Sequence, residues 1–530
     1  MDVHSRPQLF VASPARIAAR DQISNLALAA RERVTWLLSD SSGGSFPWYL
    51  TAPARRRRVA YLGIPGAGAV ESCLHFESGT LVTNDFTAGR LARELLAEAG
   101  ARDFHVVAPE GQCAPLPDRA CDVVVAGPGA SAFGVPIFSE ASRLLADKGT
   151  FLADAVHRLG LFPPAVTGEP ARVPRADLPM NMRLFPQEPG LDGPIALRGF
   201  PALERAPRPR ELRTRLRNWL LSRSALVRAV FAVLPAEPTA IDALMDRFPP
   251  CSPFVELSAT NQLAWFGKSV RVEIPITRAA AERSRRNAAR LRAFADRGNA
   301  FGPVASLVPR LVDSGDIDGV EFFVEELRPG VTLGSRPVDV GIVKRALDLL
   351  IDLHRRTAHP VRLEGEAIDR MVRRPILDLL GFAAVTEHVR ALADATARCL
   401  AGRTIPFVLA HGDFGPGNVL VDPVSGSISG LIDWDGSDDE GAPFADAVYA
   451  VTRMAGLPRD RWRDALHGLT WQYVRAMGLP EDRTLDALVV LGFASERRWH
   501  LASDRAYDPT WVREQFEVPV TRLLRALEGR

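Results

Sequence analysis

The chain has 530 residues, which at roughly 100 to 200 residues per domain predicts about three structural units. Its residues are 47% hydrophobic and 24% charged, a composition that allows large buried cores and excludes wholesale disorder. The 65 Lys and Arg residues nearly balance the 63 Asp and Glu residues, leaving a net charge of +2. This balance is not that of a broad nucleic-acid-binding surface, so we expect no nucleic-acid partner.

Cysteine usage and hydropathy favour a cytoplasmic enzyme. The five cysteines are scattered, odd in number and lack metal-type pairs, which indicates a reducing compartment. The N-terminal residues MDVHSRPQLFVASP are too polar for a signal peptide, and no long apolar run predicts membrane insertion. Only Lys148, Lys268 and Lys344 are lysines, so arginine must serve most sites that use a cation. The oligomeric state does not follow from the sequence.

Strands and helices alternate through residues 1–160. Strands are predicted at 58–63, 80–83, 104–108 and 122–126, with helices at 69–77, 88–99 and 140–145. The glycine-rich turn GIPGAG follows the first strand. This alternation predicts a Rossmann-like, doubly wound α/β sheet with a nucleoside-type ligand at the carboxyl ends of its strands.

Residues 55–160 resemble the class I S-adenosylmethionine-dependent methyltransferases in the order and spacing of these features. The resemblance implies that Gly63, Gly66 and Gly68 let the backbone approach S-adenosylmethionine. It also implies that Asp85, after the second strand, binds the ribose hydroxyls. Tyr61 stands where the family usually has an acid, and the glycine spacing is G-x-x-G-x-G. The alternative is a degenerate methyltransferase-like domain that serves as a scaffold.

A proline-rich segment divides the chain at 161–240. Eleven of the 41 prolines fall between Pro163 and Pro209, a composition typical of a connector. A basic amphipathic helix is predicted at 211–234. It either packs against its own domain or associates weakly with an anionic membrane surface.

The segment FVLAHGDFGPGNVLVDPVSGSISGLIDWDG, residues 407–436, contains the residues for a chemical step. Two apolar strands flank a His-Gly-Asp turn, and a third ends in Ile-Asp-Trp-Asp. In this pattern Asp413 can accept a proton from an attacking hydroxyl, while Asn418 and Asp433 hold Mg²⁺ against the phosphates of ATP. Their oxygen donors suit Mg²⁺. The alternative is that these are ordinary turn acids.

These blocks, HGDFGPGN and IDWD, resemble the aminoglycoside phosphotransferase and choline kinase family. The resemblance implies a bilobal, α+β protein-kinase-like fold over 241–530, with an N-lobe at 241–328 and a C-lobe at 329–530. It makes Asp413 the catalytic base and Asn418 and Asp433 the metal ligands. His411 is expected to order the loop, and Asp446, in GAPFADAVYAV, to brace the lobe.

The N-lobe is expected to bind ATP. In the family the turn between the first two strands covers the phosphates, here with Ser258, Thr260 and Asn261. The third strand presents a cation to the α- and β-phosphates, which aligns with Arg271. Lys268 is the competing candidate for this role.

The next helix departs from the family pattern, which has a Glu that pairs with the strand cation. Asn287 stands at the aligned position, and Glu282 lies five residues earlier, a spacing that does not share a helix face well. Farther along, backbone groups at Glu326, Leu327 and Arg328 are expected to meet the edge of the adenine.

The leading interpretation is an ATP- and Mg²⁺-dependent phosphotransferase that acts on a small-molecule hydroxyl and is joined to a methyltransferase-like domain. Sugars, amino sugars and glycolipid intermediates are the acceptors considered. The acidic run 438–440 either attracts a cationic acceptor or is simply solvated. Two alternatives remain. One is a bifunctional methyltransferase and kinase, and the other is a pseudokinase binding module, which is suggested by Asn287 in place of the usual Glu.

Overall fold

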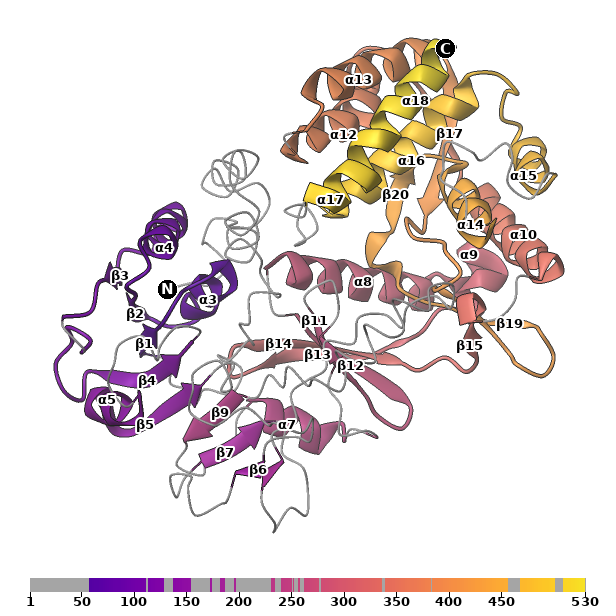
Figure 1. Ribbon diagram of the computed structural model, residues 1–530. Coiled ribbons are helices and arrows are strands. Elements are labelled where there is room, and N and C mark those ends of the chain that lie inside the picture. Colours follow the sequence, from indigo (N-terminus) through magenta and orange to yellow (C-terminus); the bar gives the residue numbers. More distant parts are fainter. Residues whose placement is uncertain are drawn as a thin grey trace. The chain divides into compact units, whose positions relative to one another are not determined.

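The protein is described by a computed structural model whose chain divides into two compact units (Figure 1). One unit comprises Met1–Ala281 with Gly315–Phe322, and the other Glu282–Ser314 with Phe323–Arg530. The described residues are 57–110, 113–127, 137–153, 172–173, 182–185, 195–196, 230–233, 240–249, 251, 256–257, 262–275, 278–335, 339–382, 384–455, 468–500 and 509–529. The predicted boundary at 160 lies outside these ranges, and the domain limits stay predictions.

The first unit contains a seven-stranded sheet in the order β3-β2-β1-β4-β5-β9-β7. Its first five strands are β1 (Arg58–Leu62), β2 (Ser78–Val82), β3 (Phe104–Val107), β4 (Cys121–Ala126) and β5 (Leu145–Ala153). Neighbours among these five are parallel. The connecting helices include α3 (Ala67–Cys73), α4 (Phe86–Glu98) and α5 (Ile137–Leu144). The order 3-2-1-4-5 confirms the predicted doubly wound sheet.

The proline-rich stretch adds two strands to this sheet. β9 (Val230–Val233) pairs antiparallel with β5, and β7 (Met182–Phe185) pairs antiparallel with β9. The helix predicted at 211–234 therefore does not include its last residues, because the apolar run VFAV forms a strand instead. Residues 211–229 lie outside the described part of the chain. A separate pair joins β6 (Arg172–Val173) to β8 (Ile195–Ala196).

The sheet predicted for the N-lobe has five strands in the order β10-β11-β12-β14-β13. They are β10 (Glu256–Leu257), β11 (Gln262–Phe266), β12 (Val270–Pro275), β13 (Leu311–Ile317) and β14 (Val320–Glu326), and α7 (Ala240–Arg247) precedes them. Trp265 is fully buried, and its Nε1 donates to the Phe248 carbonyl at 2.9 Å. An antiparallel sheet followed by a helix-rich part is the kinase-like order of elements that the sequence predicts.

The second unit is mostly helical. Its principal helices are α8 (Arg278–Asp296), α9 (Gly298–Phe301), α10 (Val340–Thr357), α11 (Glu366–Ile368), α12 (Arg374–Leu377), α13 (Thr386–Leu400), α14 (Ala445–Ala455), α15 (Leu469–Met477), α16 (Thr484–His500), α17 (Pro509–Val512) and α18 (Val518–Glu528). Among the described residues, no helix is both long and apolar enough to span a membrane.

Two small antiparallel sheets in this unit carry the catalytic motif. One orders β15 (Val331–Thr332), β18 (Val419–Val421) and β19 (Ile428–Leu431). The other orders β16 (His359–Arg362), β17 (Thr404–Ala410) and β20 (Asp438–Gly441). The chain from β17 to β20 contributes four of the six strands in these sheets, and the short connections between them keep the polar residues of the motif close together.

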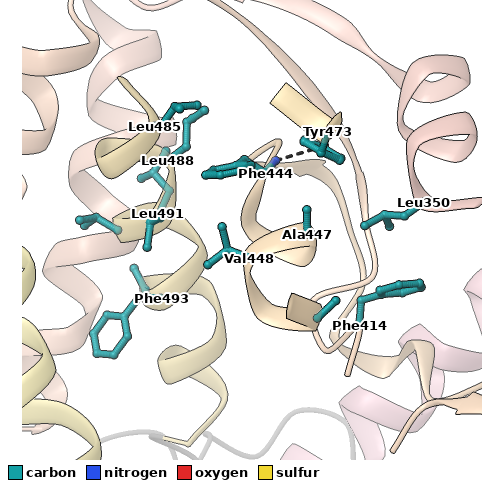
Figure 2. Packing of buried hydrophobic residues seen from close by; sticks show 14 of the residues in the cluster. Leu350, Phe414, Phe444, Ala447, Val448, Tyr473, Leu485, Leu488, Leu491 and Phe493 are labelled. Carbon is teal, nitrogen blue, oxygen red and sulfur yellow. Dashed lines mark hydrogen bonds between the residues drawn. The ribbon is translucent and has the colours of Figure 1, made fainter. Parts of the chain in front are cut away.

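The core of the second unit lies around α14. Figure 2 shows Val448 of α14 pointing toward Leu488 and Leu491 of α16, within one continuous apolar cluster. A buried polar contact joins α15 to the start of α14, where Phe444 has a φ of 76°. The Tyr473 hydroxyl accepts the Phe444 N–H at 3.1 Å (Figure 2). This bond stabilises a left-handed residue immediately before α14.

We predict that Tyr473→Phe lowers the stability of the protein by about 1 to 3 kcal/mol, because it leaves the buried Phe444 N–H without its acceptor while keeping the ring. The measurement is the urea midpoint of the full chain. The control is Arg475→Ala on the exposed face of α15, which should change stability by less than about 0.5 kcal/mol. Equal midpoints for the two variants would contradict this role of Tyr473.

Candidate active site

The loop predicted to be catalytic, which carries the His-Gly-Asp turn, begins where β17 ends. Gly412 has a φ of 83°, and a Cβ at this position would lie 2.1 Å from the Gly436 carbonyl oxygen. Only glycine fits, because the loop turns left-handed here against the backbone that follows Asp433. The glycine of the His-Gly-Asp turn thus brings the two halves of the motif together.

Asp446 of α14 holds this loop by its backbone. Its carboxylate accepts the N–H of His411 at 2.6 Å and that of Gly412 at 3.0 Å. His354 Nε2 lies 3.6 Å from the same carboxylate. Burial by itself raises the pKa of Asp446, but the approach of His354 and His411 and the hydrogen bond from the His411 N–H outweigh it and lower the pKa. A buried, ionised Asp446 thus has the geometry of the bracing acid.

His411 is completely buried, and both of its ring nitrogens are engaged. Nε2 lies 3.1 Å from the Ile432 carbonyl, and Nδ1 accepts the N–H of Asp413 at 3.3 Å. Burial is the main reason that the pKa of His411 is lowered, which favours the neutral ring. Its ring centroid lies 4.4 Å from that of Trp434. These contacts suit a residue that orders the loop and leave no nitrogen for proton transfer.

Asp413 and Asn418 form the centre of the site. Asn418 Nδ2 donates to the Asp413 carbonyl at 2.8 Å and to its carboxylate at 3.0 Å. Burial raises the pKa of Asp413, partly offset by hydrogen bonds from Tyr449 and Asn418. A raised pKa makes the carboxylate a stronger base. The sequence singled out Asp413 and Asn418 but not Tyr449, which is three residues after Asp446 on the same helix.

The predicted Mg²⁺ ligands fit a hard cation. Because Nδ2 of Asn418 faces Asp413, its Oδ1 is the atom left for a metal. The Ile432 N–H donates to the Asn418 carbonyl at 3.0 Å, which ties the strand before Asp433 to Asn418. Asp433 has left-handed angles, φ 66° and ψ 62°. Among the described residues, no group of three His, Cys, Asp or Glu is placed to hold a metal.

Asp435, the second acid of IDWD, was not assigned a role from the sequence. It is buried, and burial together with the charge of Asp433 raises its pKa to about 6. Arg283 of α8 donates to one carboxylate oxygen of Asp435 from Nε, at 2.8 Å, and from Nη2. This pair anchors α8 to the loop that bears Asp433. The two acids of IDWD are the sequence signal for a role of Asp435. Its partner Arg283 could not be found in this way, because it lies 152 residues away in the sequence.

Arg271, the predicted strand cation, has a partner on its own strand. Arg271 pairs with Glu273 at 2.7 Å, because residues two apart in a strand share a face. Asn287, at the position expected to hold a Glu, donates to Glu325 at 3.4 Å. Lys268 is exposed in the turn before β12.

The remaining nucleotide contacts are placed only in part. Ser258, Thr260 and Asn261 lie outside the described residues. The N–H of Glu326 donates to the Arg310 carbonyl at 2.9 Å, so this N–H is not available to a base. Leu327 directly follows β14. The contact of this segment with adenine stays a prediction.

The acidic run after Asp433 is matched by arginines. Asp439 accepts a hydrogen bond from Arg290 at 2.8 Å, and Glu440 accepts one from Arg370 at 2.6 Å. The hydrogen bond from Arg290 is the main reason that the pKa of Asp439 is lowered. The charges of both carboxylates are thus compensated by arginines, and this pairing disfavours the binding of a cationic acceptor to them.

The glycine-rich turn and Asp85 follow β1 and β2, two adjacent parallel strands of the first unit. Gly63 has a φ of 137°, whereas Gly66 precedes α3 with an ordinary φ of −78° and Gly68 is buried in α3. Asp85 Oδ1 accepts the N–H of Ala88 at 2.9 Å and caps α4. One oxygen of the carboxylate is thus committed to the helix, and the contact of Asp85 with ribose stays a prediction.

Tyr61 fills space at the same edge. It is fully buried, and its hydroxyl donates to the Ile64 carbonyl at 3.4 Å. A Cβ on Gly127, after β4, would lie 1.9 Å from this hydroxyl. A tyrosine packed so tightly where the family has an acid fits S-adenosylmethionine poorly.

Comparison with known proteins finds a family match within the C-terminal half. Residues 253–477 match the phosphotransferase enzyme family. No curated protein matches the chain.

The solved structures that resemble the chain fall into two groups. A type VIII aminoglycoside 3'-phosphotransferase is 20% identical, with a TM-score of 0.34, over 48% of this chain and 96% of that one. A Streptomyces rimosus aminoglycoside phosphotransferase, in complex with ADP and streptomycin, is 14% identical, with a TM-score of 0.29, over 45% and 94%. A SAM-dependent methyltransferase from Aquifex aeolicus is 14% identical, with a TM-score of 0.19, over 25% and 71%.

We predict that Arg283→Met costs about 3 to 5 kcal/mol, because it leaves the carboxylate of Asp435 buried without its cation. The double change Arg283→Met with Asp435→Leu should recover much of this loss. The matched control is Arg356→Met, whose pair with Asp352 is half-exposed and should contribute little to stability. Urea unfolding of the four proteins measures these differences, and a loss from Arg283→Met no larger than the control's would contradict the prediction.

Proposed function

We propose that the protein is an ATP- and Mg²⁺-dependent phosphotransferase that acts on a hydroxyl of a small molecule, such as a sugar, an amino sugar or a glycolipid intermediate. The observation that carries this proposal is the pair of hydrogen bonds from Asn418 to Asp413 in the braced loop. It is supported by the family match over 253–477.

Each residue of the site then has a chemical role. Asp413 orients the acceptor hydroxyl and takes its proton, while Asn418 and Asp433 hold Mg²⁺. Bound MgATP supplies the γ-phosphoryl group, whose bond to the β,γ-bridging oxygen breaks as a bond to the acceptor oxygen forms, so that ADP leaves. His411 and Asp446 keep the loop in place.

The nucleotide contacts are part of the same proposal. Arg271 is the cation for the α- and β-phosphates, and Ser258, Thr260 and Asn261 are the further residues proposed to bind the phosphates. Its ion pair with Glu273 provides the orientation that a helix Glu would otherwise supply. Leu327 and the carbonyl of Glu326 remain the groups proposed to meet adenine.

We predict that Asp413→Asn lowers kcat by about 10²- to 10⁴-fold with little change in the KM for ATP, since it removes the base but keeps the size of the side chain. ATP turnover is measured with and without Mg²⁺ across sugars, aminoglycosides and amino alcohols. Asp422→Asn is the control, because Asp422 is an acid of the same motif whose carboxylate caps a turn, at Val424 and Ser425.

The outcomes separate the competing interpretations. Turnover by Asp413→Asn equal to that of the unchanged protein would refute the assigned base. Binding of ATP with no turnover for any acceptor would indicate a pseudokinase module.

A second candidate function is methyl transfer by the first unit, favoured by Gly63 and Asp85 following adjacent strands of the sheet. The tight packing of Tyr61 favours the scaffold alternative.

Calorimetry with S-adenosylmethionine decides between them. If the unit binds the cofactor through Asp85, both Asp85→Ala and Asp85→Ser abolish binding, and only Asp85→Ser keeps the cap on α4. Binding that survives Asp85→Ser would exclude a ribose contact, and the absence of binding to the unchanged chain would exclude methyl transfer.

A further inference from the structure

One face of α14 leads outward from the catalytic loop. Asp446, Tyr449 and Arg453 are three and four residues apart, so they lie on the same side of the helix. Asp446 is buried against the loop, Tyr449 is 7% exposed, and the side chain of Arg453 is 45% exposed. The face therefore runs from the base of the catalytic loop to solvent.

Tyr449 lies beside the catalytic carboxylate. A Cβ on Gly415 would lie 3.0 Å from Tyr449 Cε1, so the ring packs on the backbone of the loop. A side-chain hydrogen bond also joins Tyr449 to Asp413. The guanidinium carbon of Arg453 lies 5.2 Å from the centre of the Tyr449 ring. A hydroxyl that reaches Asp413 thus comes next to Tyr449, with Arg453 one helical turn farther out.

The charges around this face favour an anion. Glu496 of α16 lies 3.9 Å from Arg453 and 3.3 Å from Arg497, so one carboxylate faces two guanidinium groups. The acids Asp439 and Glu440 are already paired with Arg290 and Arg370. A polycation would therefore meet compensated carboxylates, while an anion meets an exposed arginine.

We propose that the acceptor is an anionic alcohol, a small molecule with a carboxylate or phosphate group that binds Arg453 while its hydroxyl lies at Asp413. The proposal rests on the kinase function proposed above. The four residues from Tyr449 to Arg453 span about 6 Å of helix, a distance that a molecule of monosaccharide size bridges. A guanidinium has five N–H donors, so the hydrogen bond from Arg453 to Tyr449 and its long contact with Glu496 leave donors for a second anion.

The first experiment identifies the charge of the acceptor. A bacterial metabolite extract is separated by ion exchange into cationic, neutral and anionic fractions, and each is incubated with the full chain, Mg²⁺ and ATP labelled with ¹⁸O in its γ-phosphoryl group. Mass spectrometry should find labelled phosphoryl products only from the anionic fraction. Products from the cationic or neutral fraction alone would overturn the proposal, and no product from any fraction would instead refute the kinase function.

The second experiment tests Arg453 with the acceptor so identified. Arg453→Gln should raise the acceptor KM at least tenfold, with kcat and the KM for ATP little changed, and Arg453→Lys should recover part of the loss. Arg398→Gln, on the exposed face of α13, is the control and should change neither constant. An acceptor KM unchanged by Arg453→Gln, or a fall in kcat alone, would overturn the assignment.

Discussion

The site depends on one buried carboxylate, that of Asp446. A turn that places Asp413 and Asn418 at the end of a strand leaves two N–H groups, those of His411 and Gly412, without a partner in the sheet. Asp446 accepts both, and its own charge is stabilised by His354, whose Nδ1 lies 2.6 Å from the hydroxyl of Tyr473. The loop and α10 thus meet at Asp446 of α14, and α15 is joined to this group through His354. Loss of the Asp446 carboxylate would leave the N–H groups of His411 and Gly412 unsatisfied.

The parts predictable from sequence were those fixed by local chemistry. Alternating apolar runs predicted the parallel strands β1 to β4, because strands buried on both faces read as continuous hydrophobic segments. The spacing of Asp413, Asn418 and Asp433 predicted their convergence, because short turns join β17, β18 and β19. Asp446 was found through its place in a recognisable segment.

The parts that could not be predicted depend on contacts between distant segments. The Arg283 and Asp435 pair joins residues 152 apart, and nothing in an arginine-rich helix says which arginine is buried. The sequence of β9 is also compatible with the end of a basic helix, because four apolar residues fit the period of a helix and that of a strand. Only the pairing of β9 with β5 decides between helix and strand. The partner of Arg271 is close in the sequence, since Glu273 lies two residues later on the same face of the strand.

The scarcity of lysine has a structural consequence. Arginine binds a carboxylate with several donors in a fixed plane and keeps its charge when buried, so it suits pairs such as Arg283 with Asp435 and Arg290 with Asp439. Because such pairs compensate acids beside the site, the surface around Asp413 is less acidic than the sequence of the motif suggests. A run of acidic residues therefore indicates a cation-binding surface only when the arginines that face it, from other helices, are counted as well.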